Sequence, residues 1–520
     1  MRVYLEIPED ASPAHRARVS YAFRLFCAIY GHLPIMERAD AANWDVAVRY
    51  RSSSFKAQVA DRRTVWLSRG YRARNPQEPA PPPLKYACDG VETMLHYNLS
   101  GDYAPDWLGE IFEWVSCADE YSVTECDEVG RPLFAATYEG RYGLDIKVPY
   151  AGIAMRCLQQ EICRVVPRAS EEPESPCGTA HLVVPTHDVD YFPIGRLHAV
   201  NRLFRNAVIS FLLLNRPSLG LRQAKTAARI AMGYHSDPLD RIAMLTEEEQ
   251  RRGIGASYNF LVQHGHRLDA HYTLDNAGVV ETMRWLEARG MEVGIHPSYL
   301  CLDDPRGLVR ELSRLHARGF DPRGGRQHWL RYTMARLISS VERAALAYDT
   351  SIGWSVRNGF RAGACFAFPP YNFEQERAAT FLEIPMVMMD QALEKQPDGA
   401  ERMFEEAAGL LAASRRLGWG GISLLWHPAA FGEGWLPSEV GDLFWKLADR
   451  RAEWGDEWIR PMDFMEIARQ RYVEVGLLAP EEPLPADEGL AEEWIEAAVS
   501  AKADRLHDRR VEPPEGFVGT

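Results

Sequence analysis

The first 170 residues alternate between the hydrophobic pattern of a strand and that of a helix. Residues 1–7 (MRVYLEI) and 44–50 (WDVAVRY) place apolar side chains at every second position, which predicts two strands. Between them, apolar residues recur at helical spacing from Pro13 until Gly31. Proline is common at the first position of a helix, just as glycine is common after its last. This alternation predicts an α/β unit.

From residue 181 onward, short apolar runs alternate with stretches of helical period. Strands that alternate with helical crossovers predict a parallel sheet, and the many runs favour a barrel. In a β/α barrel the carboxyl ends of the strands open onto one face, where active sites assemble. The predicted strands are HLVVPTHD (181–188), GASYNFLV (255–262), MEVGIHPS (291–298), GGRQHWLR (324–331), LAYDTSIG (346–353), GFRAGACF (359–366), FLEIPMVMMD (381–390) and GISLLWHP (421–428).

A segment rich in proline, serine and glutamate, residues 167–180, separates the two patterns and predicts a domain boundary. We therefore expect a smaller α/β domain of unknown role over residues 1–170 and an irregular (β/α) barrel over residues 180–475. The barrel contains a helical insertion near residues 196–235. An acidic, proline-interrupted tail follows over residues 476–520.

Composition and charge limit the classes of protein to consider. A chain of 520 residues, 46 % of them hydrophobic, exceeds what one core usually supports, in agreement with two domains. The net charge of −14 argues against a nucleic-acid partner, because phosphate binding needs a concentrated positive surface. No apolar run approaches the ~20 residues that span a bilayer, the N-terminus has no secretory signal, and the cysteines follow no disulfide or CxxC spacing. We expect a soluble, cytoplasmic protein without a transmembrane segment; its oligomeric state stays open.

The 196–235 insertion differs from the rest of the chain. Arginine and lysine residues surround the apolar run AVISFLLL (207–214) in a basic amphipathic pattern. This pattern is typical of a surface that makes peripheral contact with anionic lipid or with polysaccharide. It is also typical of an α-hairpin that packs on the barrel and turns a basic face to solvent. Both interpretations stay open.

Ionisable residues follow most of the predicted barrel strands. Each alone has an ordinary structural explanation, such as a hydrogen-bonded histidine or a helix N-cap. A barrel, however, would bring them to one rim, where aspartates and neutral histidines suit a divalent metal such as Zn²⁺. These residues are His187, Asp188, Asp190, His296, Arg326, His328, Asp349, Arg361, Asp390 and His427.

The motifs around these residues resemble, in the same order, those of the polysaccharide deacetylases, the carbohydrate esterases of the NodB-homology type. The resemblance covers roughly residues 180–475 and implies the irregular (β/α) barrel of that family. The matching segments are THDVD (186–190), GIHPSY (294–299), GGRQHWLR (324–331), YDTSIGW (348–354), MMD (388–390) and LLWHP (424–428).

The resemblance implies a set of catalytic residues. Asp188 would be the general base, Arg326 would orient it, and His427 would be the general acid. Asp390 would tune that acid. In this type of reaction, water activated by a divalent metal, here expected to be Zn²⁺, attacks an acetyl carbonyl, and the departing amine takes a proton from the acid.

The resemblance also implies a metal site on Asp190 and His296. The family normally has a further histidine four residues after the second of these, and this sequence has Leu300 there. His328 is the nearest replacement in kind, although it comes from a different strand, and His187 is a second candidate. A degenerate, metal-free site is the alternative that this departure leaves open.

Aromatic and basic residues within the motifs suit a sugar-binding rim, since flat apolar faces stack on pyranose rings. We expect Tyr299, Trp329 and Arg361 to contact a carbohydrate substrate. The predicted function is a metal-dependent hydrolase that removes N-acetyl groups from a saccharide or polysaccharide precursor. The alternatives are deacylation of a non-sugar amide or an O-acetyl ester, and an inactive barrel that binds carbohydrate or acts as a scaffold.

Overall fold

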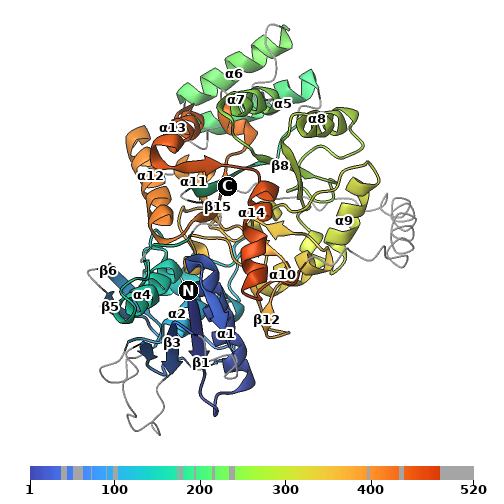
Figure 1. The fold of residues 1–520 in the computed structure, drawn as a ribbon. Coiled ribbons are helices and arrows are strands. Elements are labelled where there is room, and N and C mark those ends of the chain that lie inside the picture. Colours follow the sequence, from blue (N-terminus) through green and yellow to red (C-terminus); the bar gives the residue numbers. More distant parts are fainter. Residues whose placement is uncertain are drawn as a thin grey trace.

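The computed structural model describes most of residues 1–480. In Figure 1 the N-terminal segment (blue) lies at one end of the molecule, and the larger part of the chain (green to red) lies at the other. The predicted tail falls almost entirely on residues outside the described part. The residues that are not described are 37–43, 51–62, 72, 89–90, 98–103, 171, 175–177, 179, 193–194, 213–216, 234–240, 395–398, 433–437 and 481–520.

The N-terminal part is built on a parallel sheet. Helix α1 (Pro13–Tyr30) follows the first strand of the chain, β1 (Arg2–Glu6). Ser12 caps the first turn of this helix by accepting a hydrogen bond from the backbone N–H of His15 at 3.2 Å, and Gly31 ends the helix with φ +65°. The predicted strand–helix–strand order is confirmed. The strands lie in the order β2 (Leu33–Ile35), β1 (Arg2–Glu6), β3 (Val46–Tyr50) and β4 (Thr64–Leu67). Further elements are β5 (Leu84–Cys88), β6 (Val91–Leu95), α2 (Trp107–Val115), α3 (Tyr138–Tyr142) and α4 (Tyr150–Val165).

The larger part contains a second parallel sheet, whose strands are buried on both faces. Burial on both faces explains why these strands are continuous apolar runs rather than alternating ones. The strands lie in the order β14 (Met386–Met389), β15 (Gly420–Leu425), β7 (His181–Val189), β8 (Ser257–Leu261) and β9 (Glu292–His296), and β16 (Asp456–Trp458) pairs with the first residues of β7.

Backbone hydrogen bonds continue this sheet from β9 round to β14. The Arg326 N–H donates to the Ile295 carbonyl at 3.1 Å, and the Thr350 N–H donates to the Gly325 carbonyl at 3.0 Å. The strands that complete the ring are β10 (Tyr348–Asp349) and β13 (Leu382–Glu383), which pair in parallel, and β13 leads directly into β14. The predicted irregular (β/α) barrel is confirmed, and its irregular side is the one with these short strands.

Helices surround the barrel strands (Figure 1). In one of them, Met334, Leu337, Ile338 and Val341 are buried at the spacing of a single helical face, which packs toward the barrel. The helices are α7 (Ile242–Arg252), α8 (Ala277–Glu287), α9 (Gly307–His316), α10 (Met334–Arg343), α11 (Asp390–Glu394), α12 (Gly399–Leu417), α13 (Ser438–Trp454) and α14 (Pro461–Glu474), with the short strands β11 (Tyr371–Asn372) and β12 (Arg377–Ala378).

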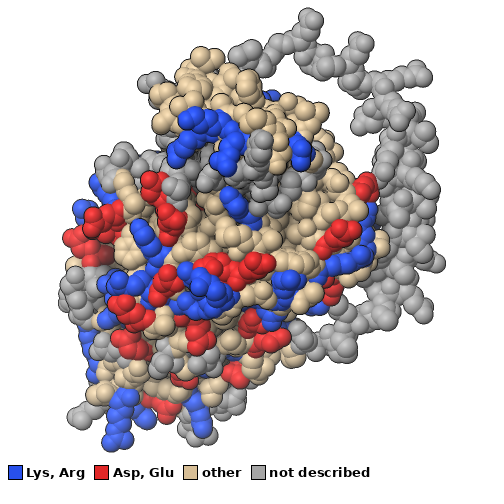
Figure 2. Space-filling model, turned by 90° about the horizontal axis from the view of Figure 1, so that it is seen from above, with Lys and Arg blue, Asp and Glu red and all other residues tan. Residues whose placement is uncertain are grey.

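The insertion after β7 forms a helical hairpin. It consists of α5 (Arg196–Leu212) and α6 (Pro217–Ala231), at the end of the molecule opposite the N-terminal sheet (Figure 1), and Figure 2 looks down on this end. Among the helices of the described residues, none is both long enough and apolar enough to cross a membrane.

The N-terminal part packs against the barrel through a shared hydrophobic core. Phe112 of α2 meets Tyr371 of β11 edge to face, with ring centroids 4.8 Å apart. The hydroxyl of Tyr21 in α1 donates to the carbonyl of Pro369 at 2.6 Å. The barrel is therefore supported along this side by the N-terminal part, and the domain boundary near residue 170 stays a prediction.

Gly420 starts β15 at a position with no room for a side chain. Its φ is +90°, and a Cβ there would lie 2.1 Å from the backbone oxygen of Leu182 on β7. We expect Gly420→Ala to lower the free energy of unfolding by at least about 2 kcal/mol, measured by urea unfolding. The control is Gly409→Ala in α12, where a Cβ meets nothing within 4 Å and should stabilise by about 0.5–1 kcal/mol. Effects of the same sign would contradict this account.

Candidate active site

Ionisable side chains gather where the barrel strands end. Asp188 is the penultimate residue of β7, and Asp190 directly follows that strand. His296 is the last residue of β9, and His427 comes two residues after β15. The strands are parallel members of one ring, so their carboxyl ends share a rim. The sequence therefore folds distant residues into one site.

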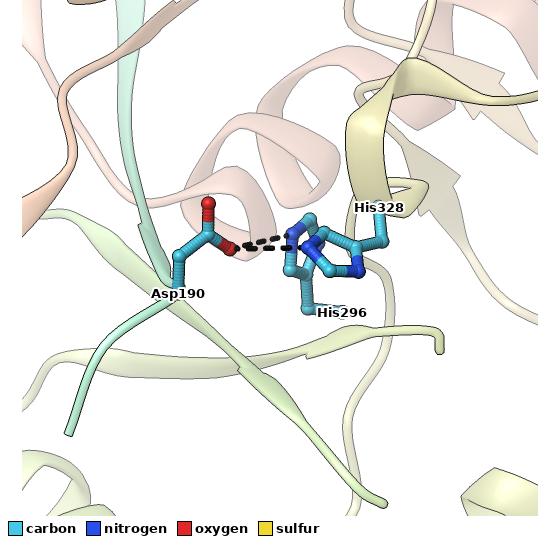
Figure 3. A group of neighbouring side chains, drawn as sticks. All are labelled: Asp190, His296 and His328. Atoms are coloured by element: carbon cyan, nitrogen blue, oxygen red, sulfur yellow. Dashed lines mark ion pairs between the residues drawn. The ribbon is translucent and has the colours of Figure 1, made fainter. Parts of the chain in front are cut away.

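Asp190, His296 and His328 form a cluster with the donor atoms of a divalent-metal site. One ligand atom from each residue lies within 4.8 Å of the others. Asp190 Oδ1 lies 3.3 Å from His296 Nε2 and 3.6 Å from His328 Nε2, and Figure 3 shows both imidazoles facing this oxygen. Both histidines are buried, whereas the Asp190 side chain is 41 % exposed. The cluster is thus open to solvent on the aspartate side.

Contacts behind each imidazole leave its Nε2 available for a metal. His296 Nδ1 lies 2.7 Å from the backbone carbonyl of Arg326, which only accepts, so Nδ1 donates this hydrogen bond and Nε2 is the nitrogen that faces Asp190. His328 Nδ1 faces Asp269 Oδ1 at 3.5 Å. A carboxylate behind a ligand histidine is the common outer partner of a metal site. Asp269 is itself held by the backbone N–H groups of Gly265, His266 and Tyr299.

Asp188 is a buried carboxylate held by two donors. Arg326 Nη1 donates to its Oδ1 at 3.1 Å, and Asn259 Nδ2 donates to the same oxygen at 2.7 Å. Arg326 is fixed in turn by the carbonyl of Thr350 and the hydroxyl of Ser423, at 2.9 and 3.3 Å. Burial by itself raises the pKa of Asp188, but the charge of Arg326 and the neighbouring histidines outweigh it, so this pKa lies below its ordinary value. Asp188 is therefore ionised at neutral pH.

His427 borders the other oxygen of Asp190. Its Nε2 lies 3.5 Å from Asp190 Oδ2, and its Nδ1 lies 2.9 Å from Asp390 Oδ1. The backbone N–H of His427 also donates to Asp390 Oδ2 at 2.8 Å. Burial lowers the pKa of His427, but the charges of Asp390 and Asp190 outweigh it and raise this pKa well above its ordinary value. The imidazole is therefore protonated at neutral pH, as a general acid requires.

His187, the second candidate for a metal ligand, has a structural position. Its Nδ1 lies 2.6 Å from the backbone carbonyl of Trp426, its Nε2 lies 2.7 Å from Glu249 Oε1, and the ring is fully buried. Successive side chains of a strand point to opposite faces, so His187 lies on the face of β7 opposite Asp188. Leu300, at the position of the missing histidine, is exposed.

Two of the residues expected to contact substrate lie close to the donor cluster of Asp190, His296 and His328. Trp329 directly follows His328, is 40 % exposed and has φ +62°, a left-handed conformation that a non-glycine residue seldom adopts. Tyr299 stacks on His266 with ring centroids 4.4 Å apart, and its hydroxyl donates to the carbonyl of Val129. Their contact with substrate stays a prediction.

Arg361, the third of these residues, lines a cavity of about 300 Å³ between the barrel rim and the N-terminal part. It forms a buried ion pair with Glu120 at 2.6 Å. The walls of the cavity also include Phe134, Leu330 and Trp354. The N-terminal part therefore helps to shape the surroundings of the site, which no pattern in the sequence indicated.

Three residues that support the site were missed in the sequence. Asn259 and Ser423 are polar residues inside otherwise apolar strands, a signal that could have identified them as facing the barrel interior. Asp269 lies in the loop after β8 and follows no periodic pattern, so only the folded loop shows that it faces His328.

No family model and no curated protein matches the sequence. Among solved structures, the chain is similar to a probable polysaccharide deacetylase from Pseudomonas aeruginosa PAO1, at 14 % identity and a TM-score of 0.37, over 58 % of this chain and 95 % of that one. It is similar to Puue allantoinase at 14 % identity and a TM-score of 0.37, over 58 % and 94 %. It is also similar to the peptidoglycan deacetylase PdaC from Bacillus subtilis, at 11 % identity and a TM-score of 0.26, over 57 % and 95 %.

Polysaccharide deacetylases thus occur more than once among the similar solved structures. The likeness extends over somewhat more than half of this chain and nearly all of each matched chain. Because all of these TM-scores are low, the assignment of the site rests on its own contacts.

The donor set fits a divalent metal of intermediate hardness. One carboxylate and two imidazoles, with one open side, are typical of zinc sites in which water or substrate takes the remaining position. The burial of the two histidines and the outer contact of His328 with Asp269 are the features of this chain that support the fit.

Zinc binding to chelator-treated protein, measured by isothermal titration calorimetry, tests the cluster. His328→Ala removes a donor, so we expect it to cost more than the roughly 10- to 100-fold in affinity that loss of an outer partner typically costs. Asp269→Asn should fall within that range. The control is His271→Ala, an exposed imidazole in the loop that carries Asp269, which should leave affinity unchanged. Wild-type affinity in His328→Ala would contradict the assignment.

Proposed function

We propose that this protein is a metal-dependent hydrolase that removes N-acetyl groups from a saccharide. The proposal rests on the two ionisable groups, Asp188 and His427, that lie beside the donor cluster. Asp188 is ionised and lies beside His296, with 3.8 Å between Oδ2 and Nε2, whereas His427 is protonated and faces Asp190. A base and an acid on one open donor cluster are the groups that amide hydrolysis needs.

The base in this proposal is Asp188. A divalent cation bound by the cluster supplies Lewis acidity, which polarises an amide carbonyl and lowers the pKa of water. Asp188 takes the proton from the attacking water through Oδ2, the oxygen that neither Arg326 nor Asn259 uses. Arg326 holds the carboxylate in a fixed orientation, so the base does not have to be positioned during the reaction.

The acid in this proposal is His427. The Nδ1–H group of the protonated ring donates to Asp390, which leaves the Nε2–H group directed toward the cluster. Water adds to the acyl carbon, the C–N bond breaks, and the nitrogen leaves as an amine with the proton from His427. Without this proton an amide nitrogen is a poor leaving group.

The aromatic surroundings favour a saccharide as the substrate. Trp329 presents a half-exposed ring next to His328. Flat apolar faces of this kind stack on pyranose rings. Zinc as the metal, substrate contacts from Tyr299 and Arg361, and a cytoplasmic location belong to the same proposal.

The inactive barrel that Leu300 left open is the weaker alternative. The convergence of three donor residues supports a site that binds metal, in which His328 would replace the missing histidine. Its Nδ1 also faces a carboxylate, Asp269, as a ligand histidine commonly does.

Asp188→Asn tests the role of the base. We expect acetate release from metal-loaded protein acting on N-acetylglucosamine oligomers to fall at least ~100-fold, because asparagine cannot accept the proton. Zinc affinity should stay within about threefold of wild type, since Asp188 is not a proposed ligand. The control is Asp275→Asn, an exposed aspartate paired with Arg318, which should keep full activity. Retained activity in Asp188→Asn would refute this role.

Trp329→Ala tests the stacking surface. Loss of the exposed ring should raise KM for the oligosaccharide about three- to tenfold and change kcat less than about twofold. Trp329→Phe should restore most of the affinity because it keeps a flat apolar face. An unchanged KM in the alanine variant, measured with the same oligomers, would remove Trp329 from the substrate site.

A further inference from the structure

The α5–α6 hairpin packs separately from the helices around the barrel. Four of its buried apolar residues form a small cluster apart from the main core: Ala199, Leu203, Ala227 and Ile230. The two helices approach closely at Gly220, where an added Cβ would lie 2.7 Å from the ring of Phe211. The hairpin therefore uses its inner face to hold its own two helices together.

Large apolar side chains of the hairpin are exposed to solvent. In the described part of the chain, seven of the fifteen exposed large hydrophobic residues lie on or directly after these two helices, and Leu212 is 76 % exposed. On α5 they recur at the spacing of one helical face. Exposed apolar patches of this kind mark contact with a partner or a membrane. The seven residues are Leu197, Phe204, Val208, Phe211, Leu212, Leu221 and Met232.

Positive charges border this apolar face. No aspartate or glutamate occurs between Asp190 and Asp237, although the whole chain has a net charge of −14. In the upper part of Figure 2, Lys and Arg atoms stand among tan atoms without red ones between them. The exposed cations of the described hairpin residues are Arg196, Arg205, Arg222, Lys225 and Arg229.

We propose that the α5–α6 hairpin docks on the surface of an anionic lipid bilayer. Its apolar side chains would enter the boundary between headgroups and acyl chains, and the arginine and lysine side chains beside them would contact lipid phosphates. A second copy of the chain suits this face less well, because a two-fold interface would bring its cations together. An anionic bilayer complements both kinds of residue, because its acyl region suits the apolar side chains and its phosphates suit the basic ones.

The hairpin also adjoins the candidate active site. Tyr191, the residue after Asp190, stacks on His198 of α5 with ring centroids 6.3 Å apart. His198 in turn lies 5.4 Å from His271, in the loop that carries Asp269. Docking through the hairpin would therefore bring the donor cluster, on this side of the barrel rim, close to the bilayer. The docking surface itself does not depend on the proposed reaction.

Cosedimentation of the full chain with vesicles tests this proposal. The vesicles are phosphatidylcholine alone, or phosphatidylcholine with about a third of phosphatidylglycerol. We expect binding to the anionic vesicles only, weakened at least about tenfold when NaCl rises from ~50 to ~500 mM, because salt screens the attraction. Arg205→Gln combined with Lys225→Gln should weaken binding by about tenfold or more.

A matched pair of leucine variants separates docking from a general effect of charge. Leu212→Glu, on the hairpin, should weaken binding to the anionic vesicles by about tenfold or more. Leu33→Glu makes the same change at a residue of β2 that is 52 % exposed, and should leave binding unchanged. Circular dichroism checks that both variants are folded.

Three results would overturn the proposal. The first is absent binding, or equal binding to neutral and anionic vesicles. The second is a dimer in analytical ultracentrifugation that Leu212→Glu dissociates, which would assign the face to a second copy. The third is crosslinking of the hairpin to the acidic segment 481–520 without vesicle binding, which would assign it to this chain.

Discussion

The site depends on the hydrogen bonds of one buried side chain, the guanidinium of Arg326. A charge in the interior costs several kcal/mol unless it is paired and its donors are satisfied. Arg326 meets Asp188 on β7, the carbonyl of Thr350 after β10 and the hydroxyl of Ser423 on β15. One side chain thus joins segments from around the ring, supports its irregular side and keeps the proposed base ionised.

The ionisable residues of the rim differ in their exposure to solvent. Asp188 and His427 are buried, so their protonation states are set by fixed partners rather than by solvent. Asp190 is exposed, so the donor cluster between them stays accessible to water and to substrate. The N-terminal part adds Phe134 to the wall of the cavity that Leu330, Trp354 and Arg361 also line.

The barrel and the gathering of ionisable residues at its rim could be predicted from the sequence because both depend on local patterns. Buried parallel strands are continuous apolar runs, and the polar residues after them mark the rim. The roles of these residues, and His328 as the replacement for the histidine missing at Leu300, came from the resemblance to the polysaccharide deacetylases and stay predictions. The orientation of side chains could not be predicted. Whether His187 or His328 faces the cluster depends on which face of its segment each occupies, and the role of Asp269 depends on a loop held by backbone N–H groups.

The most direct test of the central claim is an anomalous-diffraction map from a crystal soaked in a zinc salt. The account predicts one strong peak about 2.0–2.2 Å from Asp190, His296 and His328, with His427 and Asp188 outside the first coordination shell. A peak bound by other residues, or no peak at this cluster at full zinc loading, would contradict it.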